Sequence, residues 1–174
     1  KDLDLKSYRK LDVIGIDGNR KGPNVASWLD RKASSSKMSG AAAQVTPNEL
    51  TSKLLAAAEE KGATIIEAIA TGPIFNEDQS RVQAVQLKDG SSIECDSVCL
   101  TSGIWTSVMA EDWFDVPIPA EGIKSTSIVY DNIPQIRDEP YAAFCDEQAE
   151  FNTHLELYPR PDGTLYICGV GGSG

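Results

Sequence analysis

The stretch CDSVCLTSGIWTSVM, Cys95 to Met109, decides the expected fold, because an apolar strand-like run here leads directly into a helix-like start. The run lacks polar alternation, which predicts a strand buried on both faces. It ends in Gly-x-Trp at Gly103 and Trp105. Glycine lets the backbone turn sharply and approach another group closely. The stretch therefore predicts a strand-to-helix junction.

A helix precedes this junction in the stretch TPNELTSKLLAAAEEKGA. Thr46 is expected as N-cap, Pro47 as the first helical residue, and Glu49 as the residue that closes a capping box. Lys61 suits the negative end of the helix dipole, and Gly62 suits a left-handed terminating position. One face of about four turns is apolar: Leu50, Leu54, Leu55 and Ala58.

Strand and turn signals surround this helix. The pattern predicts a strand at 7–18 that ends in a turn at Asp17-Gly18, a strand at 63–70, and a hairpin over 81–95 that turns at Asp89-Gly90. It also predicts a short helix at 24–31 that buries Trp28 and Leu29, and a serine-rich surface loop at 32–43. From Ile118 onward, antiparallel strands with a turn at Pro161-Asp162-Gly163 are expected.

The composition limits the function classes. The chain has 174 residues, 41% hydrophobic and 24% charged, which suffices for a buried core. Its net charge of −10 disfavours nucleic acid and anionic membranes as partners and favours small molecules or protein subunits. No run approaches the roughly 20 apolar residues of a membrane span. The four cysteines lack a Cys-x-x-Cys motif, so we expect buried free thiols and an intracellular location, cytosol or organelle.

Four segments, read in order, resemble the D-amino acid oxidase and sarcosine oxidase superfamily of FAD-dependent oxidoreductases. They are AAQVTPNELTSKLLAAAEEKGATIIEAIATGPI, RVQAVQLKDGSSIECDSVCLTSGIWTSVM, PIPAEGIKSTSIVY and LELYPRPDGTLYICG. The resemblance covers most of the chain. It implies an α+β fold, part of a two-domain flavoprotein, with a mixed sheet and packed helix plus a mainly antiparallel substrate-domain sheet. It assigns residues 39–115 to the FAD-binding domain and residues 1–38 and 116–174 to the substrate domain.

The resemblance implies FAD as cofactor in the full-length protein and gives the opening junction a purpose. In such proteins this junction lies beside the cofactor, and the helix N-terminus after it faces phosphate. Backbone groups at Ala70 would lie near the adenine end. The alternative is a glycine-terminated core strand with a buried tryptophan. The cofactor-binding residues implied are Ala70, Ser102, Gly103, Ile104 and Trp105.

The substrate-domain sheet of the family supplies substrate-facing groups, which makes His154, Tyr158, Arg160 and Tyr166 candidate substrate-binding residues. Arg160 could hold a carboxylate bidentately. The alternatives are a hydrogen-bonded surface histidine and a solvated arginine in an exposed turn. No catalytic side chain can be named. The sequence has one histidine, which argues against a histidine-rich metal site or a Ser/His/Asp triad.

Two features of the family do not occur in these residues: the glycine-rich loop that receives the FAD pyrophosphate, and the final flavin-contacting segment. The string CGVGGSG spells Gly-x-Gly-x-x-Gly but more simply ends a strand or is partly a linker. The resemblance therefore implies an internal portion of a flavoprotein that oxidises a C–N bond of an amine or amino acid by hydride transfer to flavin. In isolation this portion is expected to lack FAD and activity. The alternative is a non-catalytic structural or assembly subunit that keeps the fold.

Overall fold

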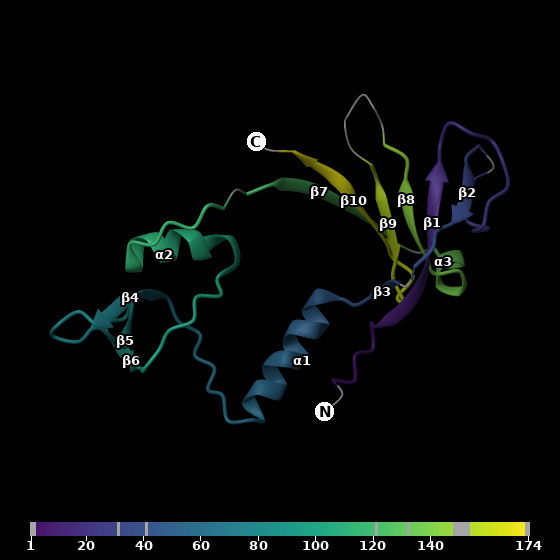
Figure 1. Cartoon of the computed structure of the whole chain (residues 1–174). Helices are drawn as coiled ribbons and strands as arrows, with labels where there is room; N and C mark the ends of the chain where they lie inside the picture. Colours follow the sequence, from purple (N-terminus) through teal and green to yellow (C-terminus); the bar gives the residue numbers. More distant parts are fainter. Residues whose placement is uncertain are drawn as a thin grey trace. The chain divides into compact units, whose positions relative to one another are not determined.

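The computed structural model describes residues 3–30, 32–40, 42–120, 122–131, 133–147 and 154–172. They form two compact units, Lys1–Ala63 with Ile123–Gly174 and Thr64–Gly122 (Figure 1). Each unit has its own sheet, which confirms the α+β class. The assignment of residues 39–115 to an FAD-binding domain and of the rest to a substrate domain stays a prediction.

The first unit is built on a mixed sheet, which has seven strands among the described residues. Its order is β2-β1-β8-β9-β10-β7, which can be followed in Figure 1. β3 also pairs with β1, at the start of that strand, whereas β2 pairs with its end. β1 and β8 are parallel and the other pairs are antiparallel. The strands are β1 (Arg9–Asp17), β2 (Ser34–Lys37), β3 (Ala42–Gln44), β7 (Lys124–Tyr130), β8 (Tyr141–Cys145), β9 (Glu156–Pro159) and β10 (Leu165–Gly172).

The core of this unit lies on one face of β1 and β8. Ile14 and Ala143 are partners in the parallel pair and are fully buried, and Ala26 from the segment after β1 closes over them. Trp28 packs on the same cluster and donates its indole N–H to the backbone oxygen of Glu139 at 3.1 Å. The short α3 (Gln135–Asp138) precedes β8 and buries Ile136 completely.

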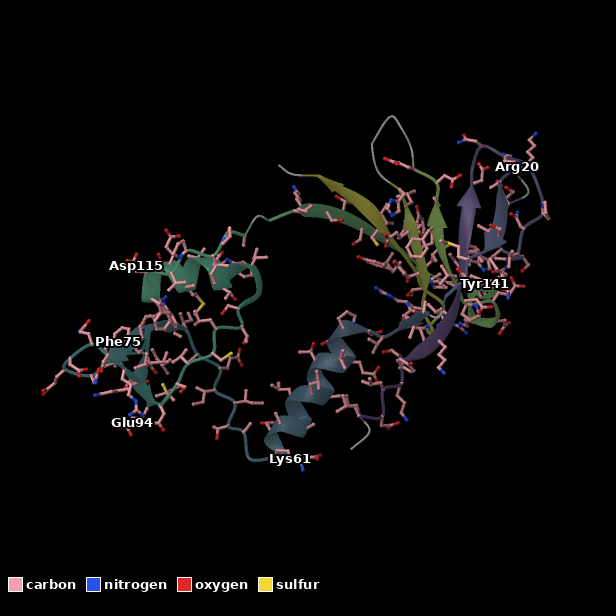
Figure 2. The ribbon with its side chains drawn as sticks, viewed as in Figure 1. Arg20, Lys61, Phe75, Glu94, Asp115 and Tyr141 are labelled. Carbon is pink, nitrogen blue, oxygen red and sulfur yellow. The ribbon has the colours of Figure 1, made fainter. Side chains whose placement is uncertain are left out.

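The helix α1 (Pro47–Glu59) matches the predicted span, with Pro47 in its first turn. Gly62 has φ +94°, and the N–H of Ala63 returns to the oxygen of Ala58, so the helix ends as predicted. Figure 2 labels Lys61 just beyond this end. The apolar side chains of α1 are not buried within the described residues; Leu54 and Leu55 are about half exposed.

The N-terminal cap of α1 differs from the prediction. Thr46 is the N-cap residue, but its side chain makes no capping hydrogen bond. Instead, the backbone N–H of Thr46 donates to the hydroxyl of Ser7 at 2.8 Å. Glu49 does not close a capping box either: its carboxylate accepts from the N–H groups of Lys6 (2.7 Å) and Ser7 (2.8 Å) and from the Ser7 hydroxyl. A tertiary contact with the segment before β1 therefore replaces the local motif.

The second unit is a three-stranded antiparallel meander with one helix. Its strands are β4 (Ala70–Phe75), β5 (Val82–Leu87) and β6 (Ser92–Glu94). The predicted hairpin at Asp89-Gly90 is confirmed, with Gly90 at φ +90°. The 3₁₀ turn η1 (Gly103–Trp105) leads into α2 (Thr106–Phe114). Phe114 packs edge-on against Phe75, labelled on β4 in Figure 2, at 6.2 Å between ring centroids, so α2 is attached to the meander.

Several local predictions are wrong. The segment 24–31 forms a turn rather than a helix in its described part, although Trp28 and Leu29 do pack on the core; Arg31 lies outside the described residues. The serine-rich 32–43 contributes the strands β2 and β3. The strand expected at 63–70 begins only at Ala70. The apolar run 97–102 is not a strand: it has no regular secondary structure and forms no ladder with any described residue. The thiols are free as expected, yet none is fully buried and Cys99 is exposed.

The cap of α1 gives the first prediction. Ser7→Ala removes the hydroxyl that serves both Thr46 and Glu49, so the free energy of unfolding should fall by about 1 kcal/mol, the usual cost of a lost cap. Thr46→Ala is the matched control and should cost clearly less, because the Thr46 side chain makes no capping bond. Urea unfolding followed by circular dichroism measures both. A larger loss for Thr46→Ala than for Ser7→Ala would contradict the arrangement.

Candidate functional site

The candidate substrate-binding residues lie on one face of the β9–β10 pair. Tyr158 on β9 is the register partner of Tyr166 on β10, and their rings lie 6.4 Å apart. Because side chains alternate along a strand, every second residue shares this face. Leu157 and Leu165 point to the other face, and Leu157 packs on the core. We call the following set the tyrosine face: His154, Glu156, Tyr158, Arg160, Tyr166 and Cys168.

Glu156 is the centre of the polar contacts on the tyrosine face. Its Oε2 accepts a hydrogen bond from the Tyr158 hydroxyl at 2.6 Å. Its Oε1 lies 3.2 Å from Nε2 of His154, and the Sγ of Cys168 lies 3.9 Å from Oε2. His154 and Tyr158, each two positions from Glu156, and Cys168, twelve positions further on, thus all contact one carboxylate.

These contacts shift two pKa values. Partial burial, followed by the hydrogen bond to the Glu156 carboxylate, raises the pKa of Tyr158 well above its ordinary value. Partial burial and the same negative charge raise the pKa of Cys168. Tyr158 is therefore a neutral hydrogen-bond donor, and Cys168 a protonated thiol, at neutral pH.

Arg160 lies at the opposite end of the tyrosine face. Its guanidinium stands over the ring of Tyr166 at 5.0 Å, a cation–π distance, so the side chain is held at the sheet rather than extended into solvent. The turn at Pro161-Asp162-Gly163 is confirmed: the N–H of Arg160 donates to the oxygen of Thr164 at 2.8 Å, and Gly163 has φ +91°. The structure thus brings all four candidate substrate residues together.

Gly169 explains part of the CGVGGSG string. It has φ +111° at the irregularity in β10 between Ile167 and Val170. A Cβ at Gly169 would overlap the backbone oxygen of His154. Gly171 continues the strand as the partner of Ser125, so Gly169 and Gly171 belong to a strand and not to a phosphate loop. Gly174 lies outside the described residues.

The opening Gly-x-Trp forms the start of a helix, as predicted. Gly103 has φ +61°, a left-handed conformation that favours glycine. Apart from its two chain neighbours, no described residue has an atom within 4 Å of the position that its Cβ would take. The N–H of Ser102 donates a hydrogen bond to the hydroxyl of Thr106 at 3.0 Å. Ile104 and Trp105 are 65% and 66% exposed, so a ligand can approach this turn without displacing protein atoms.

Ala70 lines a different part of the second unit. It begins β4 as the partner of Leu87 and borders a shallow hollow of about 320 Å³. The walls of the hollow are mainly small or aliphatic, among them Ile66, Val85 and Ile93. Such a lining suits the apolar faces of a ring better than a charged group.

Among the described residues, no group of three or more His, Cys, Asp or Glu could hold a metal ion. No helix in the described ranges has the length and apolarity needed to cross a membrane.

Sequence reasoning missed Glu156. The signal was present: in His154-x-Glu156-x-Tyr158-x-Arg160 the polar residues recur at every second position, which places them on one face of a strand. The role of Glu156 became visible only through the distances to both neighbours.

Comparison with known proteins places these features in a family. The family model described as "DAO: FAD dependent oxidoreductase" matches residues 8–173. The match therefore includes both units and every candidate site residue.

Solved structures of other proteins share the fold at low identity. They include BrvH, a flavin-dependent halogenase from Brevundimonas sp. BAL3, with 17% identity and a TM-score of 0.57 over 76% of this chain and 27% of that one. PqsL from Pseudomonas aeruginosa, described as a probable FAD-dependent monooxygenase, has 14% identity and a TM-score of 0.57 over 94% and 43%. QhpG, a peptidyl tryptophan dihydroxylase, has 11% identity and a TM-score of 0.55 over 94% and 31%. The chain thus spans less than half the length of each.

A substitution at Gly169 tests the link between β9 and β10. Gly169→Ala should lower the free energy of unfolding by roughly 2–4 kcal/mol, because the new Cβ would force β10 away from His154. Gly90→Ala is the control: Gly90 also has a positive φ, but open space surrounds its Cβ position, so about 1 kcal/mol is expected. Denaturant unfolding of the two variants measures this difference, and equal losses would contradict it.

The raised pKa of Tyr158 gives a pH-dependence prediction. The folded state keeps the Tyr158 proton at a pH where the unfolded chain has lost it. The free energy of unfolding therefore falls as the pH rises above about 10, the ordinary pKa of tyrosine. Below that pH its contribution is fully present. The free energy of unfolding of Tyr158→Phe should therefore fall less steeply above pH 10 than that of the unsubstituted protein. The same slope for Tyr158→Phe and the unsubstituted protein would count against the assignment.

Proposed function

The chain belongs to the DAO family of FAD-dependent oxidoreductases, and from this premise we propose that it serves oxidation of a C–N bond in an amine or amino acid. The observation that supports the proposal most is the tyrosine face: all the candidate substrate residues share one surface of the first unit. Aromatic rings, a guanidinium and a carboxylate suit a small polar substrate.

The turn at Gly103 would hold part of the FAD. Its residues fit this role because the backbone is open, no charged side chain occurs between Thr101 and Val108, and a helix begins there. The first N–H groups of a helix favour an anion such as a phosphate. Gly103 and Ile104 would contribute main-chain contacts, Ser102 would lie beside the cofactor, and the exposed indole of Trp105 would cover an apolar part of it.

The hollow beside Ala70 would receive another apolar part of FAD, since its walls are aliphatic. When bound, FAD supplies the acceptor for a hydride. The protein's side chains then need only to bind and orient the substrate. Arg160, fixed over Tyr166, would hold a carboxylate, and Tyr158 and His154 would contact the remainder of the molecule.

The experiment uses the protein that carries residues 1–174 in its full length. Purified protein should show the absorbance of oxidised flavin, and anaerobic addition of amines or amino acids should bleach it. Trp105→Ala should lower the flavin content per polypeptide several-fold without lowering the thermal stability of the flavin-free protein, because the indole is 66% exposed.

Leu54→Ala, a change of a comparably exposed apolar residue on α1, is the control and should leave the flavin content unchanged. Colourless protein that co-purifies in fixed proportion with other subunits would reject the oxidoreductase and favour a structural or assembly subunit that keeps the fold.

A further inference from the structure

The hydroxyl of Tyr158 already donates its only proton within the protein. A tyrosine has one O–H proton, and here it is donated to Glu156 at 2.6 Å. The phenol oxygen can then offer only lone pairs to a ligand. Glu156 thereby converts Tyr158 from a group that can donate into one that accepts.

The neighbouring groups act in the same direction. A carboxylate has no proton to donate, so Glu156 itself is an acceptor. A neutral His154 can approach Oε1 of Glu156 at 3.2 Å only with the proton on Nε2, which leaves Nδ1 as an acceptor. Among the described residues, the titratable groups that contact Glu156 are His154 and Tyr158 from the same segment and Cys168 from β10, whose thiol is a weak donor.

The charge is also distributed along the face. Glu156 is the negative group at one end, and Arg160 is the positive group at the other, four residues further along the chain. In an extended strand this separates their Cα atoms by about 13 Å. Arg160 stands over Tyr166 rather than beside Glu156, so the carboxylate is not neutralised by the guanidinium.

We propose that Glu156, with the Tyr158 hydroxyl that it orients, forms an acceptor site for a protonated amine, and so is a positioning and specificity residue of the tyrosine face. The inference rests on the proposed function, since it names the group by which an amine substrate would be recognised. It goes further because it assigns the cationic end of the substrate to a carboxylate on β9.

The probe is benzylammonium, compared with benzyl methyl ether, which has the same ring but no donor and no charge. Binding is followed by NMR through the shifts of β9 and β10 signals, with no flavin present. The unsubstituted protein should bind benzylammonium more tightly than the ether. Glu156→Gln should weaken benzylammonium binding by at least about tenfold and leave the ether unaffected. Glu59→Gln, the same change on the exposed surface of α1, should alter neither.

A second readout separates recognition from a general structural effect. Tyr158→Phe keeps the carboxylate but loses the phenol oxygen, so it should weaken benzylammonium binding less than Glu156→Gln. In Glu156→Gln the alkaline titration of Tyr158 should move to lower pH, because the carboxylate no longer opposes its ionisation.

Equal binding of the two probes overturns the inference, as does unchanged benzylammonium binding in Glu156→Gln, or no shift of β9 and β10 signals in the unsubstituted protein at millimolar benzylammonium. None of these results depends on flavin reduction. Amine binding without flavin bleaching would therefore reject the proposed oxidation alone, and bleaching with intact binding in Glu156→Gln would reject the acceptor site alone.

Discussion

The register between β9 and β10 is the constraint on which the first unit depends. With Tyr158 opposite Tyr166, the aliphatic residues of both strands face one side and the polar residues face the other. A slip by one residue would exchange these two sets and bury the Glu156 carboxylate against the apolar core, which costs several kcal/mol for an unpaired charge. The same register brings the phenol within 2.6 Å of that carboxylate. The register of β9 and β10 therefore fixes both the apolar core on one face of the pair and the candidate site on the other.

Local chemistry in the sequence was a good guide wherever the structure uses local contacts. Gly62 ends α1, Gly90 closes a hairpin and Gly103 begins a turn, and each has the positive φ that its surroundings require. The helix, the turn after β9 and the β5–β6 hairpin followed from such signals. These features depend on residues a few positions apart, which a single sequence displays.

Prediction failed where the chain uses distant partners. The Ser7 hydroxyl, 39 residues away, takes the capping role that Thr46 should have played. The serine-rich 32–43 has no strand propensity of its own, yet it pairs with the exposed edge of β1. The apolar run 97–102 is the opposite case: its composition favours a buried strand, but no described strand forms a ladder with it. Strand formation depends on a neighbour, and composition alone cannot identify one.

The candidate site shows why residue type alone is an incomplete guide to chemistry. Residue type identifies Tyr158 and His154 as groups that could contact a substrate, but it does not say whether they donate or accept a hydrogen bond. That property follows from Glu156, which takes the proton of one and faces Nε2 of the other. At the far end the Arg160 guanidinium, a group that can only donate, stands over the Tyr166 ring, and its positive charge also reaches the Asp162 carboxylate. A face with acceptors at one end and donors at the other would bind a zwitterion in one orientation only. Such an orientation would decide which C–H bond of the substrate is presented for oxidation.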